Sequence, residues 1–182
     1  RLVDDVLDLF ALERLAFSQR DGDGIQAGAV LGEHLAAARL FVAKGTLAVQ
    51  ETKGQPRAPI AARAADGAIT LPTAVLVDNG TSGAAEIFAA ALTGNKRADL
   101  IGAHTIGRAA EQQLIKLPDG SGLWLTTTRY LMPDGSPLHE KGLEPTIQAD
   151  EPTVEFGQLP PTNDPILDKA LEHLAAAAKK AA

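Results

Sequence analysis

Cysteine is absent from the 182 residues of this sequence, and so are long apolar stretches and any excess of basic residues. Without cysteine the chain has no disulfide framework, no thiol nucleophile and no cysteine metal site. No apolar run approaches the roughly 18 residues that a membrane span requires. The chain has 17 basic and 23 acidic residues, and its net charge of −6 argues against a nucleic-acid-binding surface.

Several other patterns are missing as well. No internal repeat is visible, and no pair of histidines has metal-ligand spacing such as His-x-x-x-His. We therefore expect neither a metal ion nor another cofactor. No signal peptide is recognisable, but the sequence starts at Arg1 and not at methionine, so this absence decides little.

Hydrophobic residues make up 45% of the chain, which is typical of a globular protein, and the length suits one core with a small appendage at most. Apolar periodicity and turn residues predict a mixed α/β order of elements. We expect helices at 25–42, at 84–92 and from 163 onward, strands at 46–51, 73–77 and 99–102, and a β-hairpin over 114–130. The polar, Gly- and Pro-rich residues 52–69 predict a surface excursion.

The first 24 residues are ambiguous, because Val6 to Phe10 fits a buried strand as well as a helix. We divide the chain into this N-terminal segment (1–24), a core (25–150), and a linker with a C-terminal helix (151–182). Trp124 falls on the expected hairpin, where a core or edge position is the simplest expectation.

The segment from Val75 to Leu92 predicts a buried strand, a tight turn and an apolar helix. Such a turn aims backbone N–H groups at whatever lies over the helix N-terminus, so the segment suits an oxyanion or a carboxylate. Thr81 and Ser82 in this turn have hydroxyl groups. They are candidate nucleophiles, or one of them simply caps the helix.

Four segments share their order, spacing and residue types with a known family. They are Gly80-Thr-Ser-Gly-Ala-Ala-Glu-Ile87, Thr105-Ile-Gly-Arg108, Leu125-Thr-Thr-Thr-Arg-Tyr130 and Lys141-Gly-Leu-Glu-Pro-Thr-Ile147. Over residues 70–150 the chain resembles the C-terminal-processing peptidases, also called tail-specific proteases. The resemblance implies an α/β fold of the crotonase-like, Clp-protease-like type, which is a spiral of short ββα units.

The same resemblance places the family's serine nucleophile at Gly83 and its lysine base at Arg108, and the family's glutamine is kept as Gln112. The separation of the first two, 108 − 83 = 25, is the one that the family uses. Glycine has no hydroxyl group, and an arginine guanidinium stays protonated in proteins and cannot accept a proton. Both halves of the Ser–Lys dyad are therefore replaced.

Three functions follow from this pattern. The first is a degenerate peptidase-like domain that binds polypeptide C-termini or a partner protein through Gly80, Thr81 and Arg108. The second is an active serine peptidase with Ser82 as a shifted nucleophile and His104 as a neutral imidazole base. The third is a structural or oligomerisation domain, since crotonase-like folds often associate through their helices.

Two expectations rest on the resemblance alone. The family is extracytoplasmic or periplasmic, which is the location that the resemblance implies for this chain. The family also usually carries a peptide-binding PDZ domain, and no such domain is recognisable in this sequence, which therefore resembles the protease core alone.

Overall fold

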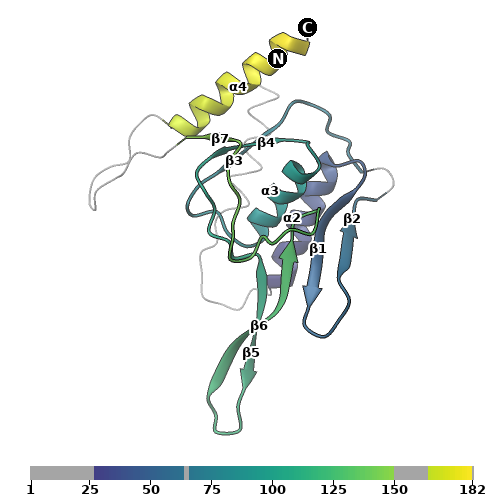
Figure 1. Cartoon of the computed structure of the whole chain (residues 1–182), viewed down its shortest axis with the longest axis vertical. Coiled ribbons are helices and arrows are strands. Elements are labelled where there is room, and N and C mark those ends of the chain that lie inside the picture. Colours follow the sequence, from purple (N-terminus) through teal and green to yellow (C-terminus); the bar gives the residue numbers. More distant parts are fainter. Residues whose placement is uncertain (1–26, 64–65, 150–163, 182) are drawn as a thin grey trace, which may run out of the picture.

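The computed structural model describes residues 27–63, 66–149 and 164–181, and these residues form two β-sheets and three helices (Figure 1). The larger sheet is antiparallel, in the order β2-β1-β6-β5, and the smaller sheet is parallel, in the order β3-β4-β7. The mixed α/β fold that we expected is confirmed. The N-terminal segment 1–24 and the linker 152–161 lie outside the described residues.

The helices and the strands of each sheet have the following bounds. The helices are α2 (Ala27–Phe41), α3 (Ala84–Gly94) and α4 (Pro165–Ala181), and the strands of the larger sheet are β1 (Thr46–Thr52), β2 (Ala58–Ala61), β5 (Ala110–Lys116) and β6 (Gly122–Leu131). The smaller sheet consists of β3 (Ala74–Val77), β4 (Asp99–Gly102) and β7 (Ile147–Gln148). All three expected helices and every expected strand have a counterpart, although β5 begins four residues before the strand that we expected.

The core lies around α3, which packs against both α2 and β1. Its inner face is small and apolar, with Ala89, Ala90 and Ala91 almost fully buried, so the two helices can approach each other closely. The Asn95 side chain closes the helix by donating to the carbonyl of Ala91 and, across the core, to that of Thr46, both at 2.8 Å. These contacts hold α3 in a fixed position between the sheets.

Helix α4 covers the smaller sheet rather than this core. Ile166 and Ala170 of α4 are buried in a second cluster with Ala74 of β3 and Ile101 of β4. The apolar stripe predicted for the C-terminal helix therefore has a partner, and Figure 1 shows α4 beside β3 and β7, away from the larger sheet.

Strand β2 was not expected, since residues 52–69 read as a surface excursion. Ala58-Pro-Ile-Ala61 nevertheless pairs antiparallel with β1, with Val49 opposite Pro59. The segment has few strand-forming residues and contains a proline, which cannot donate to a ladder and is tolerated on an edge strand. Because β2 lies at the edge of the sheet, its sequence needs few strand-forming residues and gives only a weak strand signal.

The only tyrosine of the chain, Tyr130, is buried on β6, and its hydroxyl group donates to Glu111 Oε1 at 2.8 Å. Burial, and then the bond and the charge of Glu111, raise the pKa of Tyr130 well above its ordinary value.

This raised pKa predicts a pH effect. A phenol that resists ionisation only in the folded chain stabilises the fold fully below about pH 10, and this stabilisation is lost as the pH rises further. Tyrosinate absorbance should therefore appear with unfolding, and the free energy of unfolding should fall more steeply above about pH 10 than in Tyr130→Phe. Tyrosinate at an ordinary pH in the folded chain would contradict this.

Candidate functional site

The turn after β3 is built around Asp78. Its carboxylate Oδ1 accepts hydrogen bonds from the backbone N–H of Gly80 at 2.8 Å and from the hydroxyl group of Thr81 at 2.9 Å. The same hydroxyl oxygen accepts from the Asp78 N–H at 3.0 Å, and Thr81 is buried. The predicted binding groups of Gly80 and Thr81 are thus used inside the turn, where they shape the entry to α3.

Gly83 is the residue at which this turn enters α3. Its φ of 62° and ψ of −123° lie in a region that residues with a side chain rarely adopt, so the strand passes sharply into the helix. The nucleophiles of α/β-hydrolases stand on strained strand-to-helix turns of this kind. A Cβ atom at Gly83 would have the carbonyl oxygen of Arg108 as its nearest neighbour, at 4.0 Å, so a side chain here would lie next to the backbone of the other predicted site residue.

Glu86 joins the two predicted halves of the site. Its side chain is fully buried and accepts four hydrogen bonds, two on each oxygen. Oε1 accepts from the Thr105 hydroxyl at 2.5 Å and the Gly107 N–H at 2.6 Å, and Oε2 accepts from the N–H groups of Arg108 at 2.7 Å and Gly83 at 2.9 Å. One carboxylate therefore sets the distance between the turn at Gly83 and the loop that leads to Arg108.

The helix is not capped by Thr81 or Ser82, the alternative that the sequence left open. Gly83 is its N-cap, and the only side chain that bonds to the cap is that of Glu86, from inside the first turn. A Glu three residues after the cap is half of a capping box. Glu86 belongs to the motif that the family resemblance rests on, and its spacing from Gly83 was the available signal for its structural role.

The loop before Arg108 is held from its other side by residues 138–143. The Thr105 hydroxyl accepts from the Leu143 N–H at 2.8 Å, and the Gly107 carbonyl accepts from the Glu140 N–H at 2.7 Å. Gly107 has a φ of 82°, and a Cβ there would come within 2.8 Å of the Gly142 nitrogen. Only glycine fits this approach, which explains why the motif keeps it.

The Arg108 side chain is exposed, although its backbone is fixed by Glu86. Among the described residues, its guanidinium forms no hydrogen bond or ion pair. Gln112 does not turn toward it; its amide donates to the Thr126 hydroxyl across the hairpin at 3.4 Å. The structure therefore brings Gly83 and the Arg108 backbone together and leaves the guanidinium open to solvent.

The two residues of the alternative peptidase mechanism have different surroundings. Ser82 is half-buried, and within the described part of the chain its hydroxyl group has no hydrogen-bond partner. His104 is 45% exposed, and its Nε2 lies 3.6 Å from Glu144 Oε1. No hydrogen bond joins Ser82 to His104 in the described part of the chain.

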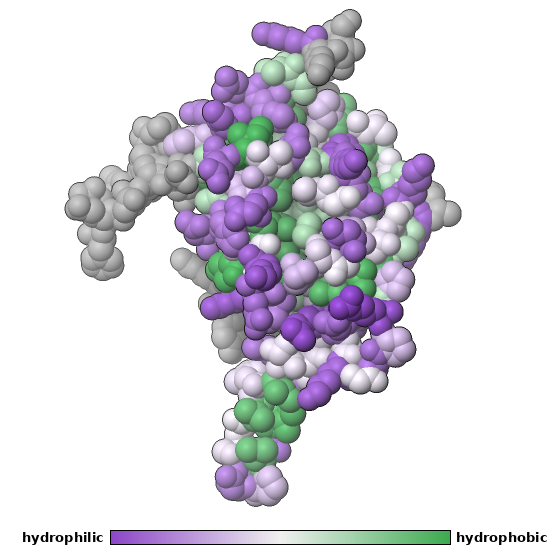
Figure 2. Space-filling model, viewed as in Figure 1, coloured by the Kyte–Doolittle hydropathy of each residue, from purple (hydrophilic) through white to green (hydrophobic). Residues whose placement is uncertain are grey.

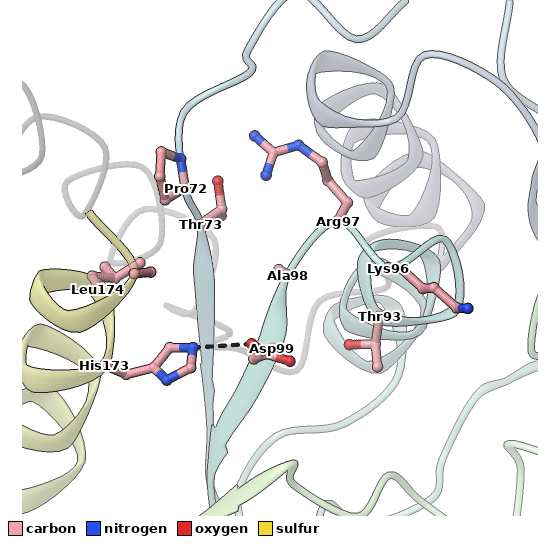
Figure 3. Close-up of a pocket in the computed structure, with 10 residues that line it drawn as sticks. Pro72, Thr73, Thr93, Lys96, Arg97, Ala98, Asp99, His173 and Leu174 are labelled. Carbon is pink, nitrogen blue, oxygen red and sulfur yellow. Dashed lines mark hydrogen bonds and ion pairs between the residues drawn. The ribbon is translucent and has the colours of Figure 1, made fainter. Parts of the chain in front are cut away.

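A cavity of about 290 Å³ lies at the other end of α3, between that helix, β4 and α4 (Figure 3). Figure 3 shows His173 of α4 directed at Asp99 of β4, and the Nε2 and Oδ2 atoms lie 2.9 Å apart. The Arg97 guanidinium at its rim donates to the carbonyls of Ile69 and Leu71. The His173–Asp99 pair joins α4 to β4, and the Arg97 guanidinium is bonded to backbone carbonyls, so these groups support the fold.

Two absences complete the description. No group of acidic, histidine or cysteine side chains within the described ranges could hold a metal ion. No helix among the described residues is long and apolar enough to cross a membrane.

Comparisons with known proteins agree on one family. The model of peptidase family S41 matches residues 27–149. The carboxy-terminal processing protease CtpA of Bacillus subtilis is 33% identical over 133 residues, which are 73% of this chain and 28% of that protein. The carboxyl-terminal-processing protease of a Synechocystis species is 31% identical over 147 residues, which are 81% of this chain and 34% of that protein.

A solved structure supports the same relationship. The photosystem II D1 C-terminal processing protease matches with a TM-score of 0.58 and 33% identity, over 66% of this chain and 31% of that one. The chain spans about a third of the length of these relatives.

Proposed function

Since the chain belongs to peptidase family S41, we propose that it is a member without the Ser–Lys dyad, and that it binds polypeptide C-termini instead of cleaving them. The observation that carries this proposal is the pair of residues at the turn. Gly83 has the backbone of a nucleophile turn and lies next to the Arg108 backbone, but neither residue has the chemical group that acyl transfer needs.

The chemistry of the dyad is specific. A nucleophilic hydroxyl group must stand on the strained turn, and an amine that can be neutral must take its proton. Glycine supplies no hydroxyl group, and a guanidinium remains protonated. The two positions are nevertheless held next to each other, because Glu86 bonds to the backbone of both segments.

The same geometry favours binding of a carboxylate. The first turn of α3 leaves backbone N–H groups without partners inside the helix, and the helix dipole adds partial positive charge there. Glu86 already brings a negative charge close by, so an incoming carboxylate depends on the exposed Arg108 guanidinium, which can bind it with two hydrogen bonds. In this proposal Gly80 and Thr81 contribute through the shape of the turn.

Binding of short apolar peptides should therefore depend on a free C-terminal carboxylate and on Arg108. We expect Arg108→Glu to weaken the binding at least about 100-fold, since a charge-assisted pair is replaced by repulsion. Isothermal titration with free and C-terminally amidated forms of one peptide measures this. Lys53→Glu, which reverses an exposed basic residue in the turn between β1 and β2, is the control and should bind normally. Equal affinity for the amidated peptide, or for Arg108→Glu, would refute carboxylate binding.

An active peptidase remains the alternative, favoured by one observation. Ser82 is the half-exposed hydroxyl residue beside the turn, whereas the Thr81 hydroxyl is used inside it. However, adjacent residues of a turn point in different directions, and a displacement of about 1 Å can cost about 100-fold in rate. We therefore place the peptidase second, and a purely structural domain third.

The finer fold assignment and the location follow the family. We propose the crotonase-like spiral, which is supported by the β3-α3-β4 unit with its parallel strand pair. We propose an extracytoplasmic location from the resemblance alone.

A further inference from the structure

The outer half of the β5–β6 hairpin projects beyond the rest of the molecule and is strongly apolar (Figures 1 and 2). Six of the ten exposed large hydrophobic side chains among the described residues lie on it. They are Leu114 (49% exposed), Ile115 (40%), Leu117 (40%), Leu123 (47%), Trp124 (65%) and Leu125 (45%). Trp124, expected in the core or at an edge, is thus the most exposed of them.

Both faces of this hairpin are apolar. The register pairs Leu114 with Trp124 on one face, and Ile115 with Leu123 on the other, where Leu125 also lies. A two-stranded ribbon without a covering layer is marginally stable in water. The hairpin therefore carries apolar side chains that no layer covers among the described residues.

The backbone of the hairpin is also open to pairing. β5 is an edge strand of the sheet order β2-β1-β6-β5, so one side of it has no neighbouring strand among the described residues. Natural proteins usually protect such an edge with charges, proline or a bulge. The register shift of β5 lies at Glu111 and Gln112, at the base of the hairpin, and Lys116 is the one charge on the strand beyond it. Between residues 112 and 126 the only charges are Lys116 and Asp119, one of each sign, while the whole chain carries −6.

We propose that this hairpin is a self-association surface, through which two copies of the chain form a two-fold dimer. A two-fold interface uses the same patch on both copies, so each Lys116 can lie near the Asp119 of the other copy without net repulsion. The neutral hairpin is the place where two otherwise acidic chains can approach each other.

The available area suits this partner. Two or three large apolar side chains lie on each face of the hairpin, so one face exposes roughly 250 Å² per copy. Two copies packed through one face would bury about 500 Å² of side-chain surface, and pairing of the β5 edges would add to it. The total lies below the 1,200 Å² or so of a stable interface and suits a weak, reversible dimer.

A lipid surface fits the hairpin less well than a second copy does. Asp119 lies in the connecting turn and is fully exposed, and hydrogen bonds from the Ser121 hydroxyl group and N–H lower the pKa of its carboxyl group. The part that would enter the bilayer first is therefore ionised, and the open edge of β5 would leave backbone groups unpaired in hydrocarbon.

Sedimentation velocity and fluorescence of the whole chain test the proposal, because Trp124 is the only tryptophan. Over a dilution series we expect a monomer–dimer equilibrium, with Trp124 emission shifting to the blue as the dimer forms. Replacing Leu114, Ile115 and Leu123 by threonine keeps strand propensity and removes apolar contacts. This variant should raise the dimer Kd at least about tenfold. Leu71→Thr, at a 49% exposed leucine outside the hairpin, should dimerise normally.

Several outcomes would overturn the proposal. They are a monomer with solvent-exposed Trp124 at every concentration, a blue emission that does not change on dilution, and a dimer that survives the threonine changes. A blue shift with lipid vesicles but without self-association would assign the patch to a membrane. The single change Ile115→Thr repeats the comparison if the triple variant does not fold. Peptide binding by Arg108 should be unchanged in both variants, which separates this test from the proposed function.

Discussion

Gly83→Ser and Arg108→Lys, combined in one chain, are expected to produce peptidase activity that the parent chain lacks. Each change restores one half of the dyad, so either one alone should be inactive. Since a general base typically contributes about 10²–10⁴-fold, the double variant should exceed either single variant by at least about 100-fold in rate. Cleavage of unstructured polypeptides with apolar C-termini is the assay.

The structure leaves room for both changes. A Cβ atom at Gly83 has no neighbour closer than 4.0 Å, so the Gly83→Ser change costs only its backbone strain, about 1–3 kcal/mol. The hydrogen bonds from Gly83 and Arg108 to Glu86 use backbone N–H groups and survive both substitutions.

The activity of the double variant should rise with pH. Arg108 is exposed, so a lysine in its place would be mostly protonated at neutral pH and would become a base only toward its ordinary pKa of about 10.4. The rates should be measured between about pH 6 and about pH 9, because the ionisation of Tyr130 destabilises the fold only above this pH range. A rate that falls with increasing pH would contradict a lysine base.

Ser82→Ala separates this proposal from its alternative. Activity in the parent chain that disappears with Ser82→Ala would establish a shifted nucleophile and refute the degenerate dyad. Activity in the double variant that survives Ser82→Ala would confirm that the serine introduced by Gly83→Ser is the nucleophile. If no variant cleaves or binds a peptide, the structural role becomes the best account of the chain.

Helices and strands could be predicted from the sequence where apolar periodicity and turn residues indicate the same element. Helix α3 has an apolar run between a glycine-rich turn and Gly94, and β3 is a continuous apolar strand, so both were predicted within a few residues. β2 was missed, because pairing with β1 and not local propensity makes it a strand. Trp124 was expected in the core or at an edge because large aromatic residues are usually covered, and the sequence does not reveal how far the hairpin projects.

The sequence could predict which residues form the site, but not how they are arranged in space. Gly83 and Arg108 could be identified as substitutions from the spacing of the motifs alone. The backbone conformation of Gly83, and its position next to the Arg108 backbone, required coordinates. The four bonds of Glu86 connect residues up to 22 positions apart, and no sequence window contains such a network.

Glu86→Ala is expected to destabilise the fold more than any other single change at the site. It removes the acceptor of four hydrogen bonds at once, and an unpaired buried donor typically costs about 1–3 kcal/mol. Because the N–H groups of Gly83 and Arg108 lie near the surface and can reach water, we expect a total loss of about 3–5 kcal/mol. For a chain of this size the melting temperature should fall by roughly 10 °C.

Glu86→Gln tests whether the charge or only the shape of this side chain matters. The amide keeps one acceptor oxygen for two of the donors, but it turns an NH₂ group toward the other two. We therefore expect an intermediate loss of about 2–3 kcal/mol. Denaturant unfolding measures both variants against Glu172→Ala, an exposed residue of α4, which should change stability by less than about 0.5 kcal/mol.

A double-mutant cycle with Thr105 shows whether Glu86 acts by joining the two segments. The Thr105 hydroxyl group donates to Glu86 and accepts from Leu143, so it transmits the position of α3 to the loop at 138–143. Thr105→Val should lose much of its effect once Glu86 is alanine, and the coupling energy should exceed about 1 kcal/mol. Additive effects, or a loss below about 1 kcal/mol for Glu86→Ala, would mean that backbone packing at Gly107 and Gly142 holds the site without this carboxylate.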